Sequence, residues 1–196
     1  MGRSVVTDSA LQFDEATHTY TVNGVEYPSV TTILKDVGLI DTSGPWYTDW
    51  HRDRGTQVHL ATALDDANDL DTETLDPAIK PYLSAWWSFM GESRCKIIDI
   101  ERRAHHPRMM YAGTIDRVVR WGAGDAIIDI KCGPPSRWHG LQTAAYKALV
   151  GGLSWRRATV HLSDDGTFKV ASHNDNSDHD AWNSALALYH WKRNAA

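Results

Sequence analysis

The sequence predicts an α/β fold in which a central mixed β-sheet is flanked by helices. Its 196 residues are enough to bury one hydrophobic core, and its hydrophobic and charged fractions of 42% and 23% are those of globular proteins. The hydrophobic period also changes along the chain, from helical spacing to three successive strands and then back to a helix and a strand. This order is typical of a single layered domain.

Each predicted element follows from local signals. Asn23-Gly24 has the residue types of a type I′ turn, so residues 17–22 and 25–27 are expected to form a β-hairpin. A short helix or turn is expected at residues 30–37. Helices are expected at residues 50–68, after Asp76 as an N-cap with Pro77 in the first turn, and at residues 137–150 and 180–193. Alternating apolar residues predict strands at residues 96–103, 111–121, 125–131, 156–162 and 167–171.

Positive charge is concentrated in the middle of the chain, although the net charge is −5. The segment from Arg94 to Arg157 holds twelve Lys and Arg residues against five Asp and Glu, whereas six carboxylates lie between Asp65 and Asp76. A basic segment attracts a phosphate backbone, but the same asymmetry arises when solvated faces average out in space. Charge alone leaves both interpretations open.

The two cysteines, Cys95 and Cys132, form no C-x-x-C motif, so neither a zinc ribbon nor an iron–sulfur cluster is expected. No apolar run approaches the roughly 20 residues that span a bilayer. The N-terminal residues lack the hydrophobic stretch of a signal peptide. We therefore expect a cytoplasmic protein with no membrane partner.

The predicted strand at residues 125–131 carries two charges among isoleucines. A strand period of two places Asp129 and Lys131 on one face, and Ile128 and Ile130 on the other. A salt bridge is the simplest interpretation of such a pair. Charged residues are nevertheless uncommon on a strand surrounded by apolar residues, so the pair is also a candidate for chemistry.

Asp116 strengthens the chemical interpretation. It lies on the preceding predicted strand, thirteen residues before Asp129, and antiparallel pairing brings the two carboxylates together. Neighbouring carboxylates repel each other unless a cation lies between them, which indicates a divalent metal ion. Oxygen ligands without thiolates favour Mg²⁺ or Mn²⁺.

Two helical pairs accompany these carboxylates. Gly55 and His59 lie one turn apart, so a small residue leaves room beside an imidazole that is able to bind a metal ion. Gln142 and Tyr146 share a helical face in the same way. Taken singly, each pair is equally compatible with ordinary packing.

Together these residues resemble the RecB-like branch of the PD-(D/E)XK nuclease superfamily. The matching residues run in order from His59 and Glu101 through Gly113-Thr-Ile-Asp116-Arg-Val and Ile128-Asp129-Ile-Lys131 to Gln142-x-x-x-Tyr146. Within the branch, the sequence is similar to mitochondrial genome maintenance exonucleases and small phage exonucleases, in which a Ser-Val-Thr opening precedes the core. The resemblance covers roughly residues 27–150.

The resemblance implies a restriction-endonuclease-like core with the order αβββαβ, in one nuclease domain over residues 1–196. Residues 1–50 would form an N-terminal hairpin and an entrance loop, with residues 38–50 and the helix of His59 at the entrance. Residues 51–150 would form the catalytic core. Residues 151–196 would supply the completing strands and a C-terminal helix.

The resemblance also implies a set of metal ligands. Asp116 and Asp129 would bind the ion, and His59 and the backbone carbonyl of Ile130 would complete the site. Glu101 matches a carboxylate of this branch that would either ligate the ion or support the ligands. The expected cofactor is Mg²⁺ or Mn²⁺, with no iron–sulfur cluster.

Three further residues would take part in catalysis. Lys131 would orient or activate the attacking water, or stabilise charge on the phosphate. Gln142 and Tyr146 would support the site or guide the strand. Cys132 departs from the family pattern, which usually has threonine after the lysine.

The basic middle of the chain and two tryptophans near the expected cleft supply the predicted contacts to DNA. Arginines would contact phosphates, and indole rings would stack on bases. The predicted DNA-binding residues are Arg102, Arg103, Arg117, Arg137, Trp50 and Trp138.

The sequence therefore predicts a metal-dependent DNA exonuclease that acts on the ends of linear DNA. Its expected setting is recombination, repair or phage DNA processing in a bacterial or phage-infected cell, with a recombination protein as a partner. A structure-specific or nicking endonuclease on the same scaffold is one alternative, and a catalytically silent DNA-binding module is another. An intact set of Asp116, Asp129 and Lys131 disfavours the silent module.

Overall fold

A five-stranded mixed sheet lies at the centre of the computed structural model, which describes residues 11–41, 48–151 and 155–194. The strand order is β4-β5-β6-β7-β8, and only β6 and β7 are parallel neighbours. These strands are β4 (Lys96–His106), β5 (Tyr111–Trp121), β6 (Gly124–Lys131), β7 (Arg156–Leu162) and β8 (Phe168–Ser172). The predicted α/β class with a mixed sheet is confirmed.

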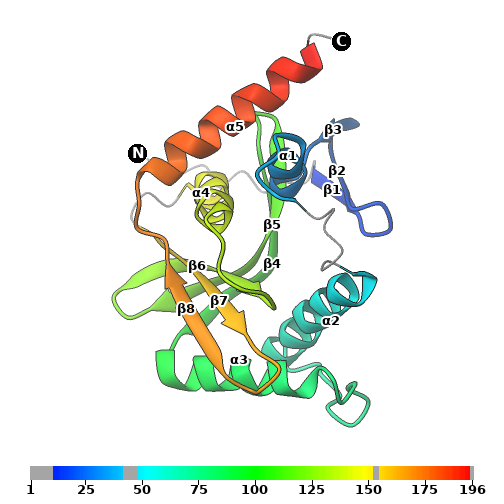
Figure 1. The fold of residues 1–196 in the computed structure, drawn as a ribbon, viewed down its shortest axis with the longest axis vertical. Coiled ribbons are helices and arrows are strands. Elements are labelled where there is room, and N and C mark those ends of the chain that lie inside the picture. Colours follow the sequence, from blue (N-terminus) through cyan, green and yellow to red (C-terminus); the bar gives the residue numbers. More distant parts are fainter. Residues whose placement is uncertain (1–10, 42–47, 152–154, 195–196) are drawn as a thin grey trace.

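Helices cover both faces of this sheet (Figure 1). One face packs against α1 (Val30–Asp36), α4 (Trp138–Val150) and α5 (Ser177–Asn194). The other face packs against α2 (Asp49–Asp66) and α3 (Lys80–Ser93). Helix α4 connects the parallel strands β6 and β7 and so lies directly after the strand that carries Asp129 and Lys131. None of the described helices has the length and apolar character needed to cross a membrane.

The helix α2 contributes little to the hydrophobic core. Its buried residues are Val58, Ala61 and Thr62. By contrast, α3 buries Tyr82, Leu83, Ala85, Trp86 and Phe89. The attachment of α2 to the rest of the fold therefore depends mainly on contacts other than the packing of a broad apolar face.

A small three-stranded sheet precedes α1. It consists of β1 (Leu11–Asp14), β2 (Thr19–Val22) and β3 (Val25–Tyr27). Asn23 and Gly24 have φ angles of 50° and 80°, as the predicted type I′ turn requires. The Tyr20 hydroxyl lies 2.7 Å from the Thr114 hydroxyl, which joins this sheet to β5.

The sequence did not predict β1 and misplaced the start of α3. Strand β1 has only four residues, too few for a clear alternation. Asp76 does not cap α3: its carboxylate accepts a hydrogen bond from the backbone of Ala78, and its carbonyl accepts one from the backbone of Ile79. These bonds form a separate turn, so the helix begins at Lys80 with Pro81 in its first turn. Residues 42–47 of the expected entrance loop lie outside the described residues.

Candidate active site

Three side chains from three different elements converge next to the sheet. They are His59 of α2, Glu101 of β4 and Asp116 of β5, and each offers a ligand atom within 4.8 Å of the other two. The Nδ1 atom of His59 lies 3.4 Å from Oδ2 of Asp116. One imidazole and two carboxylates are a ligand set that suits a divalent cation.

The position of Asp116 is fixed by the neighbouring strand. The backbone N–H of Ile130 donates a hydrogen bond of 2.7 Å to its Oδ2. Strands β5 and β6 pair antiparallel, with Arg117 opposite Ile128, which confirms the predicted pairing. Asp116 is therefore held at one orientation and is only 7% exposed.

Asp129 and Lys131 form a close ion pair on β6. Lys131 Nζ lies 2.6 Å from Asp129 Oδ2. Burial raises the pKa of Asp129 to about 6, Asp116 adds to the rise, and Lys131 opposes it. Ile128 and Ile130 pack in the opposite core, so the predicted alternation is confirmed. Asp129 is not part of the three-residue group, and its role as a ligand, like that of the Ile130 carbonyl, stays a prediction.

Glu101 has an unusual backbone for a strand residue. Its φ is 48°, in the left-handed region that non-glycine residues rarely adopt, and such strain is typical of functional sites. Burial and the nearby Asp116 raise the pKa of Glu101 to about 7, although Arg117 lowers it. The structure therefore places Glu101 among the candidate ligands, a role that the sequence left open.

The prediction that Arg117 contacts DNA is wrong. Its side chain is fully buried and forms ion pairs of 2.6 Å with Asp66 and 3.1 Å with Glu101. A phosphate backbone cannot reach a side chain in this position. The motif and charge patterns gave no indication that a neighbouring helix would cover this arginine.

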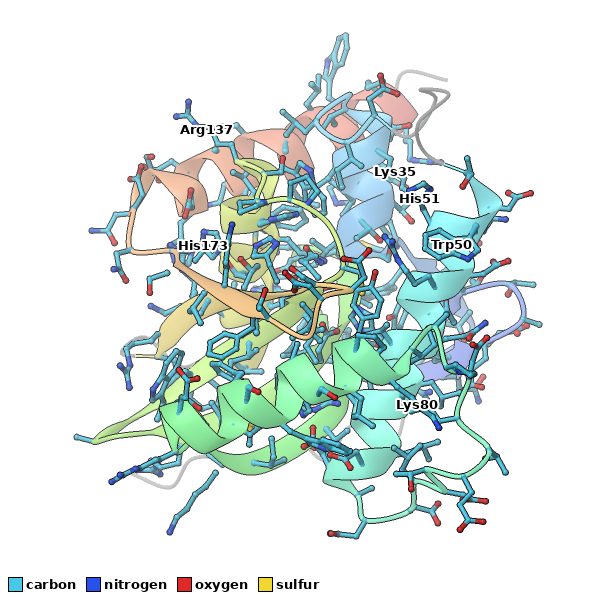
Figure 2. The ribbon with its side chains drawn as sticks, turned by 60° about the horizontal axis from the view of Figure 1, so that its bottom comes forward. Lys35, Trp50, His51, Lys80, Arg137 and His173 are labelled. Atoms are coloured by element: carbon cyan, nitrogen blue, oxygen red, sulfur yellow. The ribbon has the colours of Figure 1, made fainter. Side chains whose placement is uncertain are left out.

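The other predicted DNA-binding residues lie at the surface or partly buried. Arg102 is 3.8 Å from Asp99, and Arg103 pairs with Glu15 at 2.9 Å, so part of the positive charge of the basic segment is neutralised. Arg137 is exposed next to the first residue of α4. Trp50 is 55% exposed at the start of α2, where Figure 2 labels it beside His51, and Trp138 is half-buried. Their contacts to DNA remain predictions.

Gln142 and Tyr146 face the site from α4. The Gln142 amide donates a hydrogen bond of 3.0 Å to the Tyr146 hydroxyl. Burial raises the pKa of Tyr146 far above its usual value, and Asp129 and Asp116 act in the same direction, so the phenol stays neutral. The Gln142 Oε1 atom is buried and lacks a hydrogen-bond partner among the described residues.

The glycine of the Gly113-Thr-Ile-Asp116 segment makes room for this tyrosine. A Cβ atom on Gly113 would lie only 2.8 Å from Cε1 of Tyr146. The motif glycine therefore lets α4 bring Tyr146 close to the strand that carries Asp116.

A pocket of about 770 Å³ opens beside the candidate ligands. It is bordered by the first half of α2, the end of β6, the loop that follows and the start of α4. Among its lining residues, those with a charged or aromatic side chain are Asp41, His51, Arg54, His59, Lys131, Trp138 and His139. Lys131 Nζ lies 5.4 Å from the centre of the Trp138 ring.

Arg54 is a pocket residue that the sequence analysis missed. Its guanidinium lies 4.6 Å from the centre of the Trp50 ring and donates a hydrogen bond of 3.1 Å to the Cys132 carbonyl. Its guanidinium also lies 5.5 Å from the centre of the Tyr82 ring, and these contacts with neutral groups do not neutralise its positive charge. The residue lies outside the basic segment that the sequence singled out, five positions before His59.

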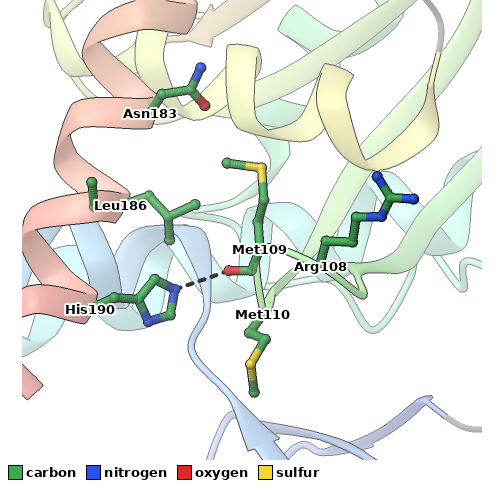
Figure 3. Close-up of a pocket in the computed structure, with 7 residues that line it drawn as sticks. Arg108, Met109, Met110, Asn183, Leu186 and His190 are labelled. Atoms are coloured by element: carbon green, nitrogen blue, oxygen red, sulfur yellow. Dashed lines mark hydrogen bonds between the residues drawn. The ribbon is translucent and has the colours of Figure 1, made fainter. Parts of the chain in front are cut away.

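A second pocket, of about 370 Å³, lies between α5 and the turn before β5 (Figure 3). Its described lining is mostly apolar, and none of these lining residues carries a carboxylate. His190 Nε2 lies 3.0 Å from the Met109 carbonyl across it. None of the three grouped residues His59, Glu101 and Asp116 lines this second pocket, whereas His59 lines the first.

The charges around the first pocket fit a divalent cation. The four carboxylates of Asp66, Glu101, Asp116 and Asp129 outnumber the two cations paired among them, Arg117 and Lys131. Burial is the main cause of the raised pKa values of Glu101 and Asp129, and the neighbouring Asp116 carboxylate adds to both. A divalent cation beside these carboxylates would offset their repulsion.

No protein-family model matches the sequence, and no curated protein matches it. Among solved structures, the chain is similar to an alkaline exonuclease (LHK-Exo) from Laribacter hongkongensis, with a TM-score of 0.48, 13% identity and coverage of 86% of this chain and 88% of that chain. The structure of LHK-Exo in complex with dAMP gives a TM-score of 0.42 at 13% identity, with the same coverage of 86% and 88%. The chemistry of the site, rather than this distant likeness, supports a function.

Proposed function

We propose that this chain is a nuclease that uses Mg²⁺ or Mn²⁺ to hydrolyse phosphodiester bonds of DNA from an end. The observation that supports this proposal is the group of His59, Glu101 and Asp116, whose ligand atoms lie within 4.8 Å of one another beside the Asp129–Lys131 pair. A surplus of carboxylates next to a lysine suits the hydrolysis of a phosphodiester, because that reaction needs both a cation site and a group that interacts with an anionic substrate.

When bound, a divalent ion polarises a phosphoryl oxygen and lowers the pKa of a coordinated water. His59, Glu101 and Asp116 would hold the ion, with Asp129 and the Ile130 carbonyl as the further ligands that the family resemblance implies. The ligand atoms of His59, Glu101 and Asp116 already lie close together in the fold, so binding an ion would need little reorganisation of these three side chains.

Lys131 has alternative roles in this proposal. Its pairing with Asp129 keeps the ammonium group beside the carboxylates, where it orients the attacking water or stabilises negative charge on the phosphate. The phenol of Tyr146 accepts a hydrogen bond from the Gln142 amide and stays neutral, so it adds no charge to the site.

The pocket supplies a path for the substrate strand. Arg54 attracts a phosphate, and Trp138 offers an aromatic face for a base, an interaction worth about 1–3 kcal/mol in proteins that bind single strands. Enzymes that select an internal sequence need elements that reach base edges. Among the described residues, the elements outside the central layers form only the small sheet β1–β3, which favours recognition of an end.

The decisive experiment compares end-labelled linear DNA with closed circular DNA of the same sequence, in Mg²⁺, Ca²⁺ and EDTA. We expect progressive shortening of linear DNA in Mg²⁺ and no cleavage in EDTA. Ca²⁺ should permit binding with little cleavage, because its larger and looser shell suits the transition state poorly. Equal cleavage of circles and linear DNA would replace the exonuclease with an endonuclease, and turnover in EDTA would contradict the metal site.

Variants test the assignment of residues. Asp129→Asn and Lys131→Met should abolish cleavage while the protein remains folded. Asp125→Asn is the matched control, because Asp125 lies on the same strand but pairs with Arg120 at 2.7 Å instead of facing the site. Full activity of either site variant would exclude its proposed role. The biological setting that the resemblance implies, recombination, repair or phage DNA processing, is part of the same proposal.

A further inference from the structure

We infer that Arg117, held by Asp66, is a positioning residue for the metal centre: its buried guanidinium joins the three elements that carry His59, Glu101 and Asp116. This inference rests on the proposed metal-dependent function. It assigns Arg117 and Asp66 no contact with DNA or with the reacting phosphate.

The first set of contacts reaches α2, the helix of His59. Arg117 Nε lies 2.6 Å from Asp66 Oδ2, and its Nη2 donates a hydrogen bond of 3.2 Å to the Thr62 hydroxyl. The Thr62 hydroxyl in turn donates to the His59 carbonyl at 3.0 Å. One arginine therefore fixes the last two turns of α2 relative to β5, including the backbone of the histidine itself.

The second set of contacts reaches the two carboxylate strands. Arg117 Nη1 donates a hydrogen bond of 3.1 Å to Glu101 Oε1 on β4 and one of 2.6 Å to the Asp116 carbonyl on β5. All three nitrogen atoms of the guanidinium are thus engaged. Arg117 bonds directly to the Glu101 carboxylate and to the Asp116 carbonyl, and it reaches the His59 carbonyl through the Thr62 hydroxyl.

The surroundings of Asp66 make this arrangement rigid. Its second oxygen, Oδ1, accepts a hydrogen bond of 3.1 Å from the Trp86 indole, whose ring is fully buried. The Arg117 guanidinium lies 5.6 Å from the centre of that ring. A buried ion pair with both carboxylate oxygens occupied has a single geometry, and geometry rather than net stability is the best-attested use of such pairs.

The backbone strain at Glu101 indicates why the ligands need the bonds that Arg117 makes. A left-handed backbone in the middle of a strand persists only when its surroundings impose it. The bond from Arg117 to the Glu101 carboxylate holds the side chain that this backbone presents. The positive charge also offsets repulsion between Glu101 and Asp116 before a metal ion arrives. The site is therefore assembled in advance of binding.

A second buried arginine provides a matched control. Arg157 of β7 is 4% exposed and pairs with Asp178 of α5 at 3.0 Å, on elements that contribute none of the candidate ligands. Asp66→Asn and Asp178→Asn therefore remove the same charge from the same kind of pair at two places. Arg117→Lys and Arg157→Lys form a second matched couple.

The test measures Mn²⁺ affinity by calorimetry in the absence of DNA, together with thermal unfolding of every variant. Outer groups that orient metal ligands typically change metal affinity 10- to 100-fold. We expect Asp66→Asn and Arg117→Lys to weaken Mn²⁺ binding by about tenfold or more. The Arg157 and Asp178 variants should bind Mn²⁺ as the unmodified protein does, whatever their loss of thermal stability.

The inference is overturned if Asp66→Asn binds Mn²⁺ no more weakly than Asp178→Asn. Thr62→Val removes one of the Arg117 bonds and leaves the ion pair in place, so it decides the question if the charge variants do not fold. A loss of affinity of about threefold is expected for it, and unchanged affinity would contradict the inference. Failure of the unmodified protein to bind Mn²⁺ would instead refute the proposed function.

Discussion

Replacing Gly113 with alanine tests how closely Tyr146 approaches β5. The added Cβ would lie 2.8 Å from Cε1 and 3.4 Å from Cδ1 of Tyr146, and 3.4 Å from Cγ2 of Val30. Normal contact between carbon atoms requires about 3.5–4.0 Å, so the ring must move by roughly 1 Å. The ring is buried and bonded to Gln142, so it has little freedom to move. Overpacking of this kind costs about 1–3 kcal/mol.

The same displacement should reduce hydrolysis. Tyr146 lies near Asp129 and Asp116, both of which raise its pKa. A displaced ring would therefore shift the Tyr146 hydroxyl relative to these two carboxylates. A misplacement of about 1 Å can lower a rate 100-fold. We expect a loss of unfolding free energy of about 1–3 kcal/mol in urea titrations, and a fall of tenfold or more in the cleavage rate of linear DNA.

Gly91→Ala is the control for this experiment. A Cβ on Gly91 of α3 would meet no atom within 4 Å, and alanine in a helix interior is favoured by about 0.5–1 kcal/mol. If Gly113→Ala matches this control in both stability and rate, the close approach of Tyr146 is refuted. A normal rate with reduced stability would show that Tyr146 only packs.

Three further outcomes follow from the site. Glu101 and Asp129 ionise at a higher pH in the folded protein than in the unfolded chain, so the metal-free protein should lose stability as the pH rises from about 4 to about 7. Glu101→Gln should recover about 1 kcal/mol of the lost free energy of unfolding, measured by thermal unfolding at pH 8 in EDTA. This value is smaller than the full pKa shift implies, because the Glu101 side chain is more than a third exposed. If the variant has the same pH profile of stability as the unmodified protein, Glu101 is not the cause of the loss. Arg54→Ala should lower DNA affinity and reduce the slope of its salt dependence by about one, whereas Arg120→Ala should leave the slope unchanged, and equal slopes would remove Arg54 from the substrate path. Burial raises the pKa of Cys132 to about 11, so its thiol should react slowly with iodoacetamide at pH 8, and rapid alkylation would show that the thiol is accessible and ionised.

Much of the fold is predictable because its strands follow simple alternation. The structure confirms the limits of the strands at residues 111–121 and 156–162, and the asparagine–glycine turn between β2 and β3. The order of elements then determines that β5 and β6 pair and that α4 follows the strand of Asp129. These features depend on local sequence and short connections, which a single sequence records well.

The parts that the sequence could not predict depend on contacts between distant elements. Arg117 is charged and lies in a basic segment, but it is buried and bonded to Asp66, which lies 51 positions earlier in the sequence. The left-handed backbone of Glu101 has no local signal, since its neighbours read as an ordinary strand. Arg54 was missed because its importance comes from the pocket wall rather than from any motif.

The sparse apolar face of α2 has a consequence for local stability. This helix buries few apolar side chains, and it is joined to the sheet by Arg117 and to the pocket by Arg54 and His59. Segments with few buried apolar contacts open at a lower free energy than the global unfolding reaction, and a ligand that binds only the closed form raises that free energy. The α2 amides should therefore exchange with solvent faster than those of α3 in the metal-free protein and become protected when a divalent ion binds. Hydrogen exchange of the α2 amides would then report whether a metal ion occupies the site that this helix covers.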